Sequence, residues 1–173
     1  EFRRVLFRSA AWARDRYDAV RAGFEVFWDE GRGVYIDHID RGVAGRAAAQ
    51  HPGAAALAAG IVPADRVARV VAGIADRSRL IKHAWVMDKV NVIDGGSAYH
   101  YMVVGYPAPE WDAETQMVEA EPFFRYVLHE GLARAGRADL VADLCRDWSY
   151  FLERGETSWP EDRSEEHTSE LQS

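Results

Sequence analysis

The feature that most limits the possible folds is a pair of amphipathic segments separated by a very short connection containing Gly136. Both segments repeat apolar residues at the spacing of an α-helix, which gives each one apolar face. Helices joined so closely must pack antiparallel, and Gly136 is well placed to end the first. The sequence therefore predicts an αα-hairpin. Its apolar residues are Phe124, Val127, Leu128 and Leu132 in residues 119–135, and Leu140, Val141, Leu144, Cys145, Trp148, Phe151 and Leu152 after Arg137.

Earlier segments predict one and a half more hairpins. Residues 10–28 carry a broad apolar face and are expected to form a helix that packs, followed by a turn at 29–33 and a short extended piece at 34–36. An Ala-rich helix is expected over 46–59, ending at Gly60, and another over 64–75. The predicted fold class is all-α, built from αα-hairpins. Cys145 is expected in the core, because it lies on the apolar face of its helix.

Residues 77–116 interrupt this helical pattern. They contain the pair Gly95-Gly96, prolines at 107 and 109, and a period-two pattern at Tyr99, Tyr101 and Val103. We expect a long, partly extended excursion, and such a segment in a compact domain is more often functional or an insertion than idle.

The two ends of the chain are related to each other. With suitable codons, residues 1–9 and 163–171 are reverse-strand translations of one another, and both resemble the translation of a sequencing-library adapter. We therefore expect residues 1–9 and 163–173 to be foreign, and residues 10–162 to be a window from a longer reading frame. Removing both ends leaves the formal net charge at −7.

Composition limits the classes of partner. The net charge of −7 and the lack of a Lys/Arg cluster speak against nucleic acid or an anionic membrane, and no apolar run is long enough to span a bilayer. The single cysteine excludes an internal disulfide and a Cys-based zinc site. No phosphate-binding Gly-rich loop or Gly-x-Ser-x-Gly elbow occurs. A neutral substrate is compatible with this composition.

The loop expected after the last helix contains the strongest candidate chemistry. Glycoside hydrolysis needs two carboxylates and an aromatic surface for the sugar ring. This loop offers Glu156, Glu161 and Asp162 beside Trp159, with Pro160 to fix its path. On residue type alone, three acidic residues in a loop are more often solvated surface charges.

Other polar and aromatic residues have competing interpretations. The run from Asp37 to Asp40 contains His38, and together with His51 it could supply metal ligands. Its spacing matches no established ligand pattern, so a polar loop rim is favoured, with a role facing substrate as an alternative. Trp85 and Trp111 could stack on a sugar or pack the excursion onto the helices.

Three stretches together resemble the catalytic domain of bacterial α-L-rhamnosidases, an inverting six-hairpin family. The first runs from Phe27 to Asp37 and continues with Gln50-His51 and residues 54–63. The second is Pro122-Phe123-Phe124 followed by residues 129–140, and the third is Trp148 followed by residues 152–161. The Ala-Gly-Arg-x-Asp-Leu hairpin at 135–140 and the closing loop behind it carry most of the resemblance.

The resemblance implies an (α/α)6 six-hairpin toroid, a carbohydrate substrate, no cofactor and no metal. It implies that Glu161 is the general base that activates water. From their residue types and loop positions, we also expect Trp159, His51 and Asp37 to bind substrate. Inversion places water between this base and a general acid roughly 6.5–9.5 Å away, for which no residue of this chain matches. Trp159-Pro160 departs from the family's aromatic-Trp pair, which shifts the indole by one residue.

Two alternatives stay open. Another six-hairpin glycosidase, such as a glucoamylase-like or glucuronyl hydrolase-like protein, would share the hairpins and differ in the upstream acid motif. A noncatalytic helical scaffold would share the stacked helices and lack paired acids, although no fixed repeat period occurs here.

Overall fold

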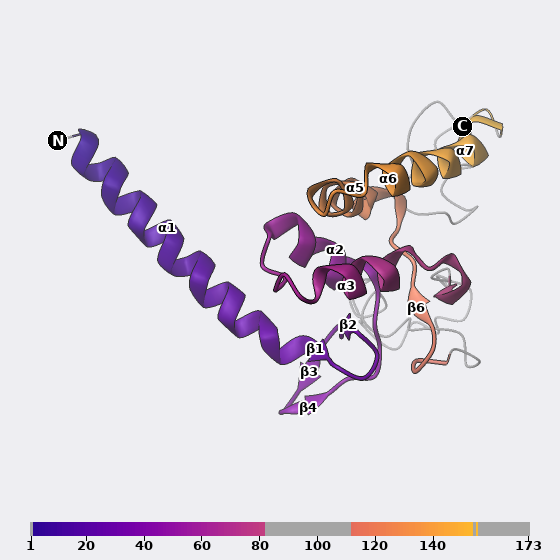
Figure 1. Cartoon of the computed structure of the whole chain (residues 1–173), viewed down its shortest axis with the longest axis horizontal. Helices are drawn as coiled ribbons and strands as arrows, with labels where there is room; N and C mark the ends of the chain where they lie inside the picture. Colours follow the sequence, from indigo (N-terminus) through magenta and orange to yellow (C-terminus); the bar gives the residue numbers. More distant parts are fainter. Residues whose placement is uncertain (1, 82–111, 154, 156–173) are drawn as a thin grey trace, which may run out of the picture.

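The computed structural model describes residues 2–81, 112–153 and 155, and most of these residues are helical (Figure 1). The helical class predicted from the sequence is confirmed at this level, and each described strand is only two residues long. Residues 82–111 and 156–173 lie outside the described part.

The elements before residue 82 are α1 (Phe2–Phe24), η1 (Glu25–Phe27), β1 (Trp28–Asp29), β2 (Val34–Tyr35), β3 (Ile39–Asp40), β4 (Val43–Ala44), α2 (Gln50–Ala59), α3 (Val67–Ala75), η2 (Arg77–Arg79) and β5 (Leu80–Ile81). The elements after residue 111 are β6 (Met117–Val118), η4 (Pro122–Phe124), α5 (Arg125–Arg134), α6 (Ala138–Cys145), η5 (Arg146–Trp148) and α7 (Ser149–Glu153).

Helix α1 projects away from the other elements, as Figure 1 shows. Trp12 is 63% exposed and Val20 59%, so the expectation that this helix packs along its apolar face is wrong for most of its length. The helix is held at its second half, where the Tyr17 hydroxyl donates to the Gly60 carbonyl at 2.8 Å and Phe24 lies 4.9 Å from the ring of Tyr35. Apolar periodicity predicts that a helix has a face to bury, but the partner for that face is a tertiary property.

The predicted turn at residues 29–33 is confirmed. Asp29 pairs with Val34 in an antiparallel two-stranded ladder, and Gly33 N–H donates to the Asp29 carbonyl at 2.8 Å. Gly33 has φ +69°, a conformation that glycine adopts without steric cost. The expected helix to residue 28 is four residues too long, because η1 and β1 replace its last turn.

Helix α2 is the most enclosed helix, with Ala54 and Ala56 fully buried. It ends at Gly60, which adopts the left-handed conformation (φ +68°) predicted for a helix cap. Its start is four residues later than expected, because the backbone before it is bound elsewhere: Val118 N–H donates to the Ala48 carbonyl at 3.0 Å, and Ala49 forms a parallel bridge with Val118.

The two described ends of the predicted excursion lie side by side. Leu80 and Ile81 in β5 pair in parallel with Met117 and Val118 in β6. The extended character predicted for residues 77–116 is thus found at Leu80 and Ile81, which pair with residues directly after the excursion, and residues 82–111 lie outside the described range.

Helices α5 and α6 are connected by Ala135, Gly136 and Arg137 and pack against each other. Gly136 adopts φ +76°, and Arg137 N–H donates to the Leu132 carbonyl at 2.9 Å, as expected for a glycine-terminated helix. The second helix is not continuous: η5 separates α6 from α7.

Cys145 is exposed, so the expectation of a core residue is wrong. Leu144 is 7% exposed and takes the buried position, and each residue of a helix is rotated by about 100° from the one before it. The buried stripe of α6 is therefore narrower than the apolar pattern suggested.

The closest helix contact lies between α2 and α5 at Gly131. A Cβ atom there would lie 2.7 Å from the Ala54 carbonyl oxygen and 3.1 Å from Leu57 Cβ. Backbone cannot move away as a flexible side chain can, so the two helices approach at a distance that only glycine permits.

We predict that Gly131→Ala lowers the free energy of unfolding by about 1–3 kcal/mol, since the overlap outweighs the gain in helix propensity. Urea denaturation of the variant and the wild type measures the difference. Gly23→Ala in α1 is the matched control, because its Cβ meets nothing within 4 Å, and it should be neutral or stabilising by up to about 1 kcal/mol. Equal effects of the two substitutions would contradict the close contact.

Candidate functional site

Two of the four predicted site residues, Asp37 and His51, lie in the described part of the structure. Glu161 and Trp159 lie outside it, as do Trp85 and Trp111. Asp37 and His51 therefore define the described part of the candidate site.

Asp37 directly follows the buried segment Val34–Ile36 and reaches the start of α2. Its Oδ1 accepts from the backbone N–H of Ala49, the residue before the helix, at 2.9 Å. Its Oδ2 is buried and has no hydrogen-bond partner among the described residues. Burial raises the pKa of this carboxyl, and the Ala49 N–H and the positive charge of Arg32 oppose that rise only in part.

His51 is the second residue of α2 and lies at the same end of the helix as Asp37. Its ring centroid is 4.5 Å from that of Phe124, with the planes tilted by 48°, a favourable geometry for two aromatic rings. The structure thus brings together one residue from the loop after β2, one from α2 and one from η4. The first and last of the three, Asp37 and Phe124, are 87 positions apart in the sequence.

Gln50 anchors this end of α2; the sequence placed it in the first rhamnosidase-like stretch but gave it no role. Its side chain is 1% exposed: Nε2 donates to the Ile74 carbonyl at 2.6 Å, and Oε1 accepts from Ala120 N–H at 2.7 Å. Both ends of the amide are paired, which is what a buried polar group requires. Gln50 therefore links α2 to the end of α3 and to the chain after β6, and it holds the backbone beside His51.

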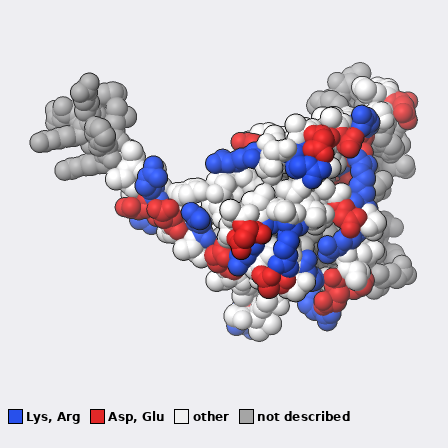
Figure 2. Space-filling view, in the orientation of Figure 1, with Lys and Arg blue, Asp and Glu red and all other residues white. Residues whose placement is uncertain are grey.

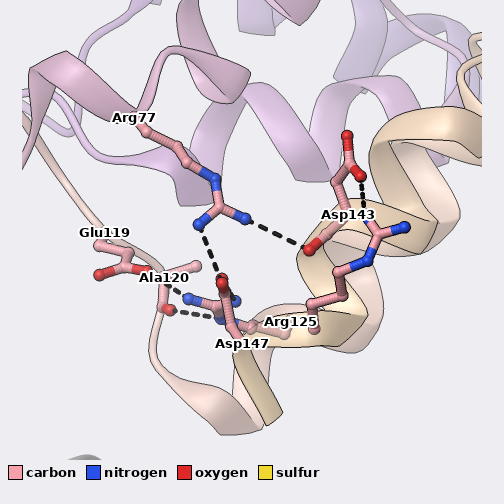
Figure 3. Close-up of polar contacts among 7 residues, drawn as sticks. Arg77, Glu119, Ala120, Arg125, Asp143 and Asp147 are labelled. Atoms are coloured by element: carbon pink, nitrogen blue, oxygen red, sulfur yellow. Dashed lines mark hydrogen bonds and ion pairs between the residues drawn. The ribbon is translucent and has the colours of Figure 1, made fainter. Parts of the chain in front are cut away.

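A second set of polar residues missed by the sequence lies around Arg125 (Figure 3). Arg125 is 2% exposed and donates to the carboxylates of Glu119 and Asp147, the latter at 2.7 Å. Asp147 also accepts from Arg77 at 2.9 Å. The Arg125 and Arg77 guanidiniums lower the pKa of Asp147, although burial acts in the opposite direction. This ion cluster joins η2, the chain after β6, α5 and η5. Helical spacing places Arg125 on the same face as Leu128 and Leu132, but its residue type gave no reason to expect a buried position.

The metal site considered for residues 37–40 and His51 is not formed. Among the described residues, no group of three or more His, Cys, Asp or Glu side chains is placed to hold a metal ion. His38 and Asp40 are exposed, whereas Asp37 faces the start of α2.

Acidic and basic side chains are interspersed over the face drawn in Figure 2, without a continuous basic surface over its described residues. Within the described helices, none is both long and apolar enough to cross a bilayer.

No family model, curated protein or solved structure matches this chain. The functional interpretation consequently depends on the sequence motifs and on the geometry around α2.

We predict that Arg125→Ala lowers the free energy of unfolding by about 3 kcal/mol or more, because it removes the buried cation that pairs with Glu119 and leaves Asp147 paired with the more exposed Arg77. Equilibrium denaturation measures the loss. The control is Arg137→Ala, which removes an exposed pair with Asp139 and should cost less than about 1 kcal/mol. A loss at Arg125 no larger than at Arg137 would show that the cluster does not hold these elements together.

We predict that Asp37→Asn stabilises the chain relative to wild type more at neutral pH than at about pH 4. Because the pKa of Asp37 is raised in the fold, the folded state binds its proton more tightly, and stability falls as pH rises from the unfolded value of about 3.9 through the folded pKa. Asn does not titrate, so this loss disappears in the variant. Denaturation at both pH values measures it, with the exposed Asp40→Asn as control; a pH-independent difference would contradict the burial of the charge.

Proposed function

We propose that residues 10–162 are part of a glycoside hydrolase that removes terminal α-L-rhamnose from rhamnosides by inversion. In this proposal the helices belong to a six-hairpin toroid, and the loop after α7 carries the general base Glu161. The substrate is a carbohydrate, and neither a metal nor a cofactor takes part.

The observation that carries the proposal is the contact between His51 and Phe124. Each residue belongs to a different stretch of the rhamnosidase-like pattern: His51 to the first and Phe124 to the second. If the resemblance had arisen by chance in two separate segments, there would be no reason to expect contact between them in the structure. The third stretch begins at Trp148 in η5, next to Asp147, which pairs with Arg125 one residue after the second stretch's Phe124.

The geometry suggests different roles for the two described site residues. The proposal places His51 on the substrate side of the first turn of α2, packed on Phe124. Asp37 accepts from the N–H of Ala49, two residues before His51, and this bond fixes the start of the helix. Asp37 thus contributes to substrate binding by holding the residues that precede His51.

Glu161 acts, in this proposal, on the water that attacks the anomeric carbon. A carboxylate base removes one proton from this water while a general acid on the opposite face protonates the leaving oxygen. Trp159 lies two residues earlier and supplies an apolar surface for the sugar ring.

The test is hydrolysis of p-nitrophenyl α-L-rhamnoside by the complete reading frame that contains residues 10–162, comparing wild type with Glu161→Gln. Loss of the general base should lower kcat by roughly a hundredfold or more, with an unchanged circular dichroism spectrum. Glu156→Gln, five residues earlier in the same loop, is the matched control and should retain activity.

The other outcomes are equally specific. Full activity of Glu161→Gln would remove this residue from the mechanism. A well-folded wild type that hydrolyses a different glycoside would assign the chain to another six-hairpin glycosidase, and one without any glycosidase activity would favour the noncatalytic helical scaffold.

A further inference from the structure

His129 on α5 is a half-buried side chain to which the proposed reaction gives no role. Its Nε2 is buried and has no hydrogen-bond partner among the described residues. It lies four residues, or about one helical turn, after Arg125. An imidazole in this position is stable while neutral, because only its charged form requires two acceptors.

Among the described residues, the two carboxylates of the ion cluster, Asp147 and Glu119, are already paired with arginines. Arg125, on the same helix, repels a positive imidazole, whereas Asp147 on η5 attracts it. Asp147 already accepts from Arg125 and from Arg77, which reaches it from η2 (Figure 3). Glu119, on the chain after β6, is paired with Arg125.

A protonated His129 would therefore disturb the ion cluster in either of two ways. If the protonated imidazole finds no acceptor, it adds a second positive charge beside Arg125, which is 2% exposed. Burial of the charged imidazole then costs free energy. With Asp147 as acceptor, it withdraws that carboxylate from Arg125 and Arg77. Both routes weaken the contact between α5 and η5.

We propose that His129 is an acid-sensitive latch whose protonation releases the segment formed by α6, η5 and α7 from α5. This inference does not depend on the proposed glycosidase activity. Burial and Arg125 both lower the pKa of His129, so the latch stays closed at neutral pH. It opens below the unperturbed histidine value of about 6.5.

Cys145 offers a position for a spin label within the segment that is released. It is the single cysteine of the chain, it is exposed, and it is the last residue of α6, directly before η5. A nitroxide spin label on Cys145 of the 173-residue chain reports the mobility of this segment by electron paramagnetic resonance. In the wild type, the mobile fraction should rise at least about twofold as the pH is lowered from about 8 to about 5, with a midpoint below about 6.5.

His129→Gln should keep the label restricted over the same range, because its amide does not titrate. His38→Gln, which removes an exposed histidine, is the matched control and should follow the wild type. Release at the same pH in His129→Gln overturns the proposal. So does a wild-type label that stays restricted at about pH 5, or one that is already mobile at about pH 8.

Two further measurements keep the test decisive if Gln disturbs folding. His129→Leu fills a similar volume without a titratable nitrogen and should also suppress the transition. In the wild type alone, an imidazole signal in the nuclear magnetic resonance spectrum should titrate with the midpoint of the label transition. The absence of such a signal overturns the proposal without any variant.

Discussion

Helices α2 and α5 approach each other so closely at Gly131 that a single β-carbon would overlap the Ala54 carbonyl. They share a more extensive contact than any other pair of described elements, and Ala54, Ala56, Leu128 and Leu132 are buried at it. Small residues on one helix and leucines on the other allow this approach while filling the space between them. The positions of α3 on one side and α6 on the other follow from it, because both pack on this pair.

Polar bridges at the end of this contact attach the remaining elements. Gln50 connects α2 to Ile74 and Ala120, and Arg125 connects α5 to Glu119 and Asp147. Both side chains are almost completely buried and have their polar atoms paired, so removal of one partner leaves an unpaired group in the core. Glu119 and Ala120, which these side chains hold, directly follow β6, so both bridges fix the chain at the end of this strand.

The arrangement connects the candidate site with the acid-sensitive cluster. His51 packs on Phe124, the residue directly before Arg125, and His129 follows Arg125 by one turn of the same helix. One short stretch of chain, from η4 into α5, therefore contacts the first turn of α2 and also holds η5 through Asp147. A displacement of η5 would act on the stretch that supports His51.

The sequence by itself determined the local elements. The helical class, the turn at 29–33, the extended residues at 34–35 and the glycine caps at Gly60 and Gly136 follow from periodicity and from the φ values that only glycine adopts readily. Helix boundaries were displaced by up to six residues, as at the start of α5, because tertiary contacts such as the bridge between Ala49 and Val118 compete with helix formation at the ends. The sequence also named Asp37 and His51, and the resemblance added Glu161 and Trp159, which lie outside the described residues.

Only the tertiary structure decided which faces find a partner. The apolar stripe of α1 and the thiol of Cys145 were expected to pack and are exposed, whereas the polar side chains of Gln50 and Arg125, which were not expected in the core, are buried. The spacing of apolar residues indicates that a segment is helical and on which side of the helix these residues lie. Burial of a polar group depends on acceptors and donors brought from elsewhere in the chain, such as Ile74, Ala120 and Asp147, and these distances are set by packing rather than by local sequence.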